Sequence, residues 1–230
     1  MKTSLVLAVA VCALAPALRA ETLTGTVELT GTPPVMQRLK READPVCGKV
    51  QMNDESVLLK DKKLANVWVH VVAGAPDAAP PADQVTIDQK DCMYRPRIVT
   101  AVVGQTVLAK TSDPTLHNVH ARLGTETVFN KGMPNQNSKP VEYKADRPGV
   151  VSLKCDVHPW MRGFIGVNKN GYQAISGEGG EFKIDGLAPG KYTLEAWHEK
   201  FGVKTQDVTI EKGKAASVKF TFDSSDKPAQ

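Results

Sequence analysis

Apolar and polar residues alternate along most of the chain with the two-residue period of β-strands. In one such run Val151, Leu153 and Cys155 share one parity. Ser152 and Lys154, which lie between them, share the other. Because successive side chains of a strand point to opposite faces, we expect Cys155 to point inward from the end of a core strand. Runs of this kind are bounded by Gly, Pro, Asn and Asp, and sustained helical periodicity is scarce, so the sequence predicts an all-β protein.

A break in composition divides these strands into two units. Apolar-rich runs at 23–29 and 65–72 precede residues 74–83, a stretch rich in Pro and Ala that suits a linker. A new unit is therefore expected to begin near Gln84. Residues 31–64, between the first two runs, are polar and irregular, and no regular structure is predicted for them.

The C-terminal region predicts two last strands and a tail. The strands are expected at 205–210 and 216–222, with Glu211-Lys212-Gly213 as a hairpin turn between them. Residues 224–230 are polar, and we expect them to be disordered.

The first 20 residues have the pattern of a cleaved secretory signal. Lys2 gives the positive start, Leu5 to Leu14 form a short apolar stretch, and Ala20 is a small residue suited to cleavage. The apolar stretch is shorter than the roughly 20 residues that a membrane-spanning helix needs, and no second candidate follows. We therefore expect a periplasmic or secreted protein with no membrane span.

The charge balance gives no sign of a polyanionic partner. The chain has 29 basic and 25 acidic side chains, and loss of Lys2 and Arg19 with the signal would leave 27 against 25, a net charge of +2. The basic residues are scattered and form no face interleaved with aromatic residues, so nucleic-acid binding is not predicted.

Three cysteines would remain after export, an odd number in a compartment where thiols tend to pair. Cys155 lies beside other metal-ligating residue types, whereas Cys47 and Cys92 lie in polar, turn-like surroundings. We therefore hypothesise a Cys47–Cys92 disulfide and a metal-bound Cys155. A bridge over that loop would stabilise the fold by about 4 kcal/mol in the chain-entropy model.

A thiolate, an imidazole and a thioether occur on one short loop, at Cys155, His158 and Met161. A second imidazole, His117, lies 38 residues upstream of Cys155. Two His and one Cys in a trigonal plane, with a long axial Met, are the ligands of a blue-copper centre. These four residues are our candidate metal ligands, with copper cycling between Cu(I) and Cu(II).

The spacing of these ligands is similar to the ligand loop of amicyanin, including the Pro-aromatic pair between His158 and Met161. Residues 84–169 therefore resemble a cupredoxin domain of the plastocyanin and amicyanin kind. The resemblance implies a Greek-key β-sandwich and the ligand set His117, Cys155, His158 and Met161. It also implies that His158 lies near the surface and that a redox partner docks at the apolar patch around His158, Pro159 and Trp160.

A second resemblance covers the rest of the mature chain. The segments 64–69 and 180–194 are similar to the carboxypeptidase regulatory-like, transthyretin-like sandwich. Residues 21–74 and 170–223 would then form this second, smaller, discontinuous sandwich, with the cupredoxin domain inserted into it. The combination resembles exported bacterial plastocyanin-like and methylamine-utilisation proteins.

Other interpretations stay open for several of these residues. Cys155 with the two histidines could hold zinc, although a thioether is a poor zinc ligand. His120 could be an additional ligand, but strand alternation places it on the face opposite His117. His70 and His198 could form a second metal site, although packed or outward histidines are the simpler interpretation.

Three aromatic residues of the second sandwich allow one more interpretation. Trp68, Trp197 and Phe182 are expected in its core, although sandwiches of this kind sometimes contact carbohydrate.

The sequence predicts no enzyme. It contains no nucleophile with a paired base, no Gly-rich phosphate loop and no haem-attachment motif. The function that we expect is single-electron transfer by a periplasmic blue-copper protein. The alternative is a copper- or carbohydrate-binding envelope protein with no redox role.

Overall fold

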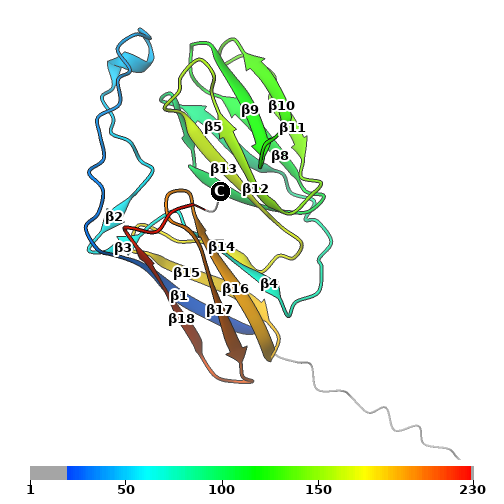
Figure 1. Ribbon diagram of the computed structural model, residues 1–230. Coiled ribbons are helices and arrows are strands. Elements are labelled where there is room, and N and C mark those ends of the chain that lie inside the picture. The colour runs from blue at the N-terminus through cyan, green and yellow to red at the C-terminus, as the bar shows by residue number, and fades with distance from the viewer. Residues whose placement is uncertain (1–19, 229–230) are drawn as a thin grey trace, which may run out of the picture.

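The computed structural model describes residues 20–228, so the predicted signal peptide lies almost wholly outside the described residues. Within this range the regular structure consists of strands β1 to β18 and one 3₁₀ helix of three residues. Figure 1 shows two β-sandwiches stacked end to end. The prediction of an all-β protein with two sandwiches is confirmed.

The first sandwich, here called the outer sandwich, is built from both ends of the chain. Its strands are β1 (Glu21–Thr30), β2 (Leu59–Lys60), β3 (Lys63–Leu64), β4 (Trp68–Ala73), β14 (Gln173–Ile175), β15 (Glu181–Leu187), β16 (Gly190–His198), β17 (Gly202–Ile210) and β18 (Ala216–Asp223). One sheet has the order β15-β1-β3-β2, with β18 also paired to β1, and the other has the order β14-β4-β16-β17. Alternate residues of β1 face the core between the sheets, where Leu23, Val27 and Leu29 are almost fully buried.

The second sandwich, here called the inserted sandwich, lies between β4 and β14 in the sequence. Its strands are β5 (Val85–Lys90), β6 (Met93–Arg95), β7 (Ile98–Val102), β8 (Thr106–Thr111), β9 (His117–Leu123), β10 (Glu126–Met133), β11 (Val141–Lys144), β12 (Gly149–Lys154) and β13 (Arg162–Asn168). They form a sheet β10-β9-β12-β13-β7 that faces a sheet β11-β8-β5-β6. Val151, Leu153 and Cys155 are at most 2% exposed, as their shared parity predicts.

The two sandwiches are fixed to each other by packing and by a buried ion pair. Trp68 of β4 lies against Gly166 of β13 so closely that a Cβ at position 166 would be 2.5 Å from its ring. Arg97, before β7, forms a bidentate ion pair with Glu199 of the outer sandwich, and both side chains are largely buried. We therefore describe the two sandwiches as one body.

Residues 31–58, here called the strap, leave the outer sandwich after β1 and return to it at β2. Their two arms run side by side, joined by a hydrogen bond from the N–H of Leu39 to the carbonyl of Met52 (2.9 Å). The strap's tip carries the 3₁₀ helix η1 (Cys47–Lys49). In Figure 1 the strap, blue to cyan, rises along the inserted sandwich to the end far from the outer sandwich.

Two expectations for the C-terminal region need correction. β17 and β18 form no hairpin, because β18 crosses to the other sheet and pairs in parallel with β1. The turn residues at 211–213 indicate a reversal of chain direction after β17, but not which strand β18 pairs with. Residues 224–228 are not disordered: Ser224 donates its N–H to Thr30, and Asp226 pairs with Lys204 (2.8 Å).

Candidate metal centre

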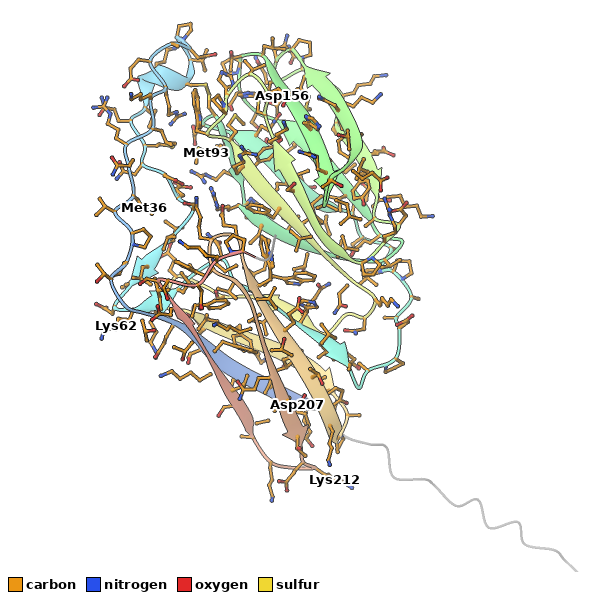
Figure 2. The ribbon with its side chains drawn as sticks, viewed as in Figure 1. Met36, Lys62, Met93, Asp156, Asp207 and Lys212 are labelled. Carbon is orange, nitrogen blue, oxygen red and sulfur yellow. A yellow bond between two sulfur atoms is a disulfide. The ribbon has the colours of Figure 1, made fainter. Side chains whose placement is uncertain are left out.

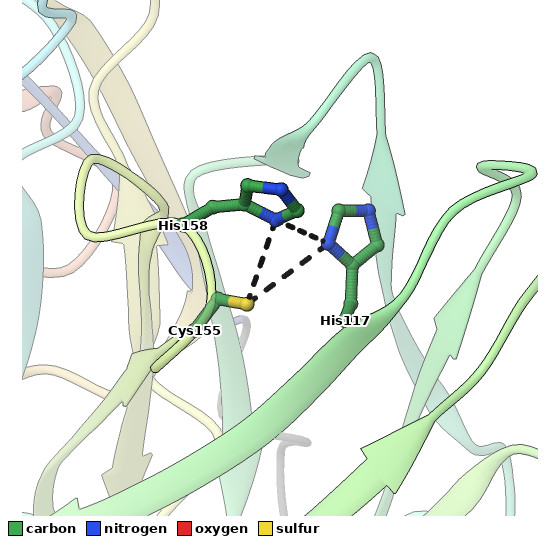
Figure 3. A group of neighbouring side chains, drawn as sticks. All are labelled: His117, Cys155 and His158. Atoms are coloured by element: carbon green, nitrogen blue, oxygen red, sulfur yellow. Dashed lines mark hydrogen bonds between the residues drawn. The ribbon is translucent and has the colours of Figure 1, made fainter. Parts of the chain in front are cut away.

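Three potential metal donors converge at the end of the inserted sandwich (Figure 3). His117 begins β9, Cys155 follows β12, and His158 lies in the loop before β13. The Nδ1 atoms of His117 and His158 are 2.9 Å apart, and Sγ of Cys155 lies 3.9 and 3.8 Å from them. The three side chains are at most 3% exposed. Each therefore presents a donor atom to the same small, buried space.

The dimensions of this triangle fit a metal ion. With metal–nitrogen bonds of ~2.0 Å and a metal–sulfur bond of ~2.3 Å, a trigonal ion would separate the nitrogens by ~3.5 Å and each nitrogen from sulfur by ~3.7 Å. The observed sulfur–nitrogen separations of 3.9 and 3.8 Å are close to these values, and the nitrogen pair is somewhat closer. Two imidazoles and one thiolate are also the equatorial donors that copper takes in blue-copper proteins.

A tight loop between β12 and β13 positions the remaining candidate ligand. Met161 donates its N–H to the carbonyl of His158 (2.9 Å), and Cys155 donates its N–H to the carbonyl of Met161 (3.4 Å). The Met161 side chain is fully buried and belongs to the same hydrophobic cluster as Cys155. The loop thus brings all three of its predicted ligands to one end of the sandwich.

The thiol of Cys155 is set up to ionise. Burial opposes its ionisation, but hydrogen bonds with His117 and His158 and the backbone N–H of Asn118 outweigh burial and lower its pKa to about 6. A thiolate is the form that binds a metal. At neutral pH this cysteine is therefore ready to act as a ligand.

Asp113 holds the far side of the His117 ring. Its carboxylate lies 2.9 Å from Nε2 of His117 and accepts the backbone N–H groups of Asp91 and Cys92, both at 2.8 Å. Burial lowers the pKa of His117, but Asp113 and the Cys155 thiolate raise it to about 9 overall. Because a metal binds the neutral imidazole, a metal ion would displace a proton from His117 when it binds.

His158 is buried, whereas we expected it near the surface. It is 3% exposed because the tip of the strap covers its outer edge. Its Nε2 lies 3.0 Å from Oδ2 of Asp44 and 3.6 Å from Sγ of Cys47, both on the strap. Pro159 is exposed and Trp160 is half-buried, so only part of the expected apolar patch is open.

The hypothesised disulfide is present in the structure. Cys47 of the strap is bonded to Cys92, in the turn between β5 and β6, and Cys155 is the free cysteine of the described residues. The bridge therefore ties the strap to the inserted sandwich beside the candidate ligands.

The other three histidines that the sequence singled out lie away from this cluster. His120 contacts Asp156 (3.0 Å) and Thr127 (3.1 Å), on the face opposite His117. His70 stacks on Trp68 with ring centroids 3.7 Å apart. His198, also buried, stacks on a phenylalanine of the outer sandwich. In the part of the chain that the structure describes, none of the three joins a group of metal-ligating side chains.

The aromatic residues considered for carbohydrate contact are mainly in the core. Trp68 and Phe182 are at most 5% exposed, and Trp197 is half-buried. Carbohydrate contact by the outer sandwich stays an untested prediction.

Two residues of the site were not found from the sequence, namely Asp44 and Asp113. A signal for Asp44 was available, because it lies three residues before Cys47, and the hypothesised disulfide would bring that segment to the inserted sandwich. Asp113 lies four residues before His117, which places both near one strand end. Neither sequence spacing predicts the hydrogen bond between the carboxylate and its histidine, which is Asp44 with His158 and Asp113 with His117.

A comparison with known protein families agrees with the second resemblance. Residues 166–223 match the family model of the carboxypeptidase regulatory-like domain. Solved structures similar to parts of this chain include cupredoxins. They include a purple cupredoxin from Nitrosopumilus maritimus, with 23% identity over 36% of this chain and 99% of the other, at a TM-score of 0.32. Amicyanin from Paracoccus versutus is 24% identical over 44% of this chain and 97% of its own, at a TM-score of 0.34.

A third neighbour is a copper-containing nitrite reductase from Thermus scotoductus, 22% identical over 43% of this chain and 25% of its own, at a TM-score of 0.34. No curated protein matches the sequence significantly. Among residues 20–228, no helix is long and apolar enough to span a membrane.

Proposed function

We propose that this chain is an exported blue-copper protein that carries single electrons. The observation that supports this most strongly is the buried triangle of His117 Nδ1, His158 Nδ1 and Cys155 Sγ. Met161, buried on the same loop, would supply a thioether as the fourth ligand. When bound there, copper would supply a reversible Cu(I)/Cu(II) couple.

The residues of the site suit electron transfer better than catalysis. The thiolate and thioether favour the reduced ion and the imidazoles suit both oxidation states, so the ligands can stay in place when the charge changes. Their burial excludes water, and four protein ligands leave no position for a substrate. We therefore propose that the chain is not an enzyme.

A redox partner protein would dock beside His158. Val157 and Pro159 of the ligand loop are exposed, and the Trp160 ring lies 5.0 Å from that of His158. The outer sandwich would act as the scaffold that carries the strap, and the place of action would be the periplasm or the exterior of the cell.

One observation favours a second function, the holding of copper without electron transfer. His158, through which an electron would leave most directly, is only 3% exposed. Slow electron self-exchange in a protein that binds copper tightly would support this alternative.

The deciding experiment is stoichiometric addition of Cu(II) to the purified mature protein, followed by visible and electron paramagnetic resonance spectroscopy. We expect an intense thiolate-to-copper charge-transfer band and narrow copper hyperfine splitting. Voltammetry of the same sample then distinguishes the two functions. A reversible response supports an electron carrier, and its absence supports a protein that only holds copper. A colourless protein that retains zinc instead would contradict the proposal.

A further inference from the structure

The strap is attached to the metal centre by several independent contacts. Besides the disulfide at its tip, Arg41 donates to the backbone carbonyls of Val50 (3.2 Å) and Asp91. Its guanidinium carbon lies 5.9 Å from the centre of the Trp160 ring, within the ligand loop. The strap's tip is therefore held in a defined position over the ligands.

A second anchor lies further along the strap. Glu55 forms a bidentate ion pair with Arg95 of β6, with its second contact at 2.9 Å. The strap is thus fixed to the inserted sandwich both at its tip and on its returning arm.

These anchors fix the carboxylate of Asp44. Its Oδ1 accepts the backbone N–H groups of Val46 (2.7 Å) and Cys47 (2.9 Å). Its Oδ2 accepts the hydroxyl of Thr115 (2.9 Å) and faces Nε2 of His158 at 3.0 Å. Four donors thus orient one carboxylate, and the fourth is a candidate metal ligand.

The geometry assigns different tasks to the two nitrogens of His158. Nδ1 faces Cys155 and His117, so its lone pair is available to a metal, whereas Nε2–H donates to Asp44. A carboxylate in this position fixes the tautomer and ring orientation and makes the imidazole a stronger donor. Among the described residues no lysine or arginine pairs with Asp44, so its negative charge is not offset by a salt bridge.

We propose that Asp44 is a positioning residue for His158, and that it stabilises Cu(II) relative to Cu(I) and so lowers the reduction potential of the site. The inference rests on the proposed copper function. Asp44 belongs to the strap and not to the inserted sandwich, so the outer sandwich contributes directly to the properties of the metal centre. The 3% exposure of His158 means that no open water shell competes with this carboxylate.

The test compares Asp44→Asn, which removes the charge but keeps the shape, with Asp44→Ala, which removes both. Glu42→Gln is the matched control, because Glu42 lies on the same strap, is exposed and pairs only with Arg38. Loss of a carboxylate behind a metal-bound histidine typically reduces affinity about 10–100-fold, and this loss should fall on Cu(II). With Cu(I) affinity nearly unchanged, the potential should rise by about 60–120 mV, at 59 mV per tenfold for one electron.

A second readout uses the protein without metal. Nitrogen-15 NMR of the imidazoles should show His158 with its proton on Nε2 in the wild type, and a changed tautomer balance in Asp44→Ala. If Asp44→Ala fails to fold, the reduction potential of Asp44→Asn alone is compared with that of the wild type. Unchanged potentials together with an unchanged His158 spectrum would overturn the role of Asp44. A wild-type protein that forms no blue site while its His158 spectrum responds to Asp44→Ala would instead overturn the copper function alone.

Discussion

The carboxylate of Asp44 lies 3.0 Å from Nε2 of His158, although the two residues are 114 positions apart in the sequence. Cys47, three residues after Asp44, is bonded to Cys92, whose backbone N–H binds Asp113. Asp113 in turn faces Nε2 of His117. A single disulfide therefore lies between the two carboxylates that hold the two candidate imidazole ligands.

Replacement of Cys155 by serine should abolish the intense charge-transfer band, because a hydroxyl cannot replace the copper–thiolate bond. Met161→Gln should keep copper and the band but shift the reduction potential, because an amide would replace the thioether among the ligands. Visible spectroscopy and voltammetry measure the two effects. His120→Gln is the control, because His120 lies outside the cluster, and full colour in Cys155→Ser would refute the ligand assignment.

The double replacement Cys47→Ala/Cys92→Ala should destabilise the protein. The bridge closes a loop with a sequence separation of 45 residues, so its loss should lower the free energy of unfolding by about 4 kcal/mol in the chain-entropy model. Denaturant unfolding measures the change. A reducing agent should destabilise the wild type to a similar extent and leave the double variant unaffected, and equal responses of the two proteins would contradict the expectation.

Removal of Glu199 should weaken the junction between the sandwiches. Glu199→Ala would leave Arg97 buried without a charge partner, which typically costs about 3–5 kcal/mol. The double variant Arg97→Met/Glu199→Leu should lose less, because no unpaired charge remains. Thermal unfolding measures both. Arg147→Ala, which breaks an exposed ion pair, should have little effect, and a comparable loss there would argue against a special role of the junction.

His198 should make the protein less stable in mild acid. Burial, together with nearby Arg97 and Lys200, lowers its pKa from 6.5 to about 3, so the unfolded chain binds a proton that the folded chain does not. Stability from this group is complete above pH 6.5 and declines as the pH falls, by about 2 kcal/mol down to about pH 4.5. Urea unfolding at several pH values measures it. His198→Phe should flatten this dependence, and parallel curves for the two proteins would rule out the contribution.

The sequence predicted the strands and the grouping of His117, Cys155 and His158 better than the contacts between distant segments. The parity of Val151, Leu153 and Cys155 is a local property, and it correctly indicated a core strand with an inward cysteine at its end. The partner of β18 is not local: the same alternating pattern suits a hairpin with β17 or a parallel pairing with β1, and the second is found.

The position of the strap was the largest structural feature that the sequence did not predict. A disulfide, ion pairs and backbone hydrogen bonds hold the strap in place, so it needs no continuous apolar face. Its residues are therefore polar and irregular. No hydrophobic period marks such a segment. The hydrophobic pattern therefore did not predict its cover over His158, and only the hypothesised disulfide connected its tip to the inserted sandwich. The expectation of an open imidazole followed from a resemblance to proteins in which that edge is exposed.

The strap also bears on how the chain can be divided. A fragment of residues 84–169 would carry His117, Cys155, His158 and Met161, yet it would lack Asp44 and would leave Cys92 without its partner. The inserted sandwich lies between β4 and β14 of the outer sandwich in the sequence. The strap in turn extends from the outer sandwich to the far end of the inserted sandwich (Figure 2). The two sandwiches are thus not independent modules, and the candidate metal centre would lose the Asp44 contact to His158 if the inserted sandwich were transplanted alone.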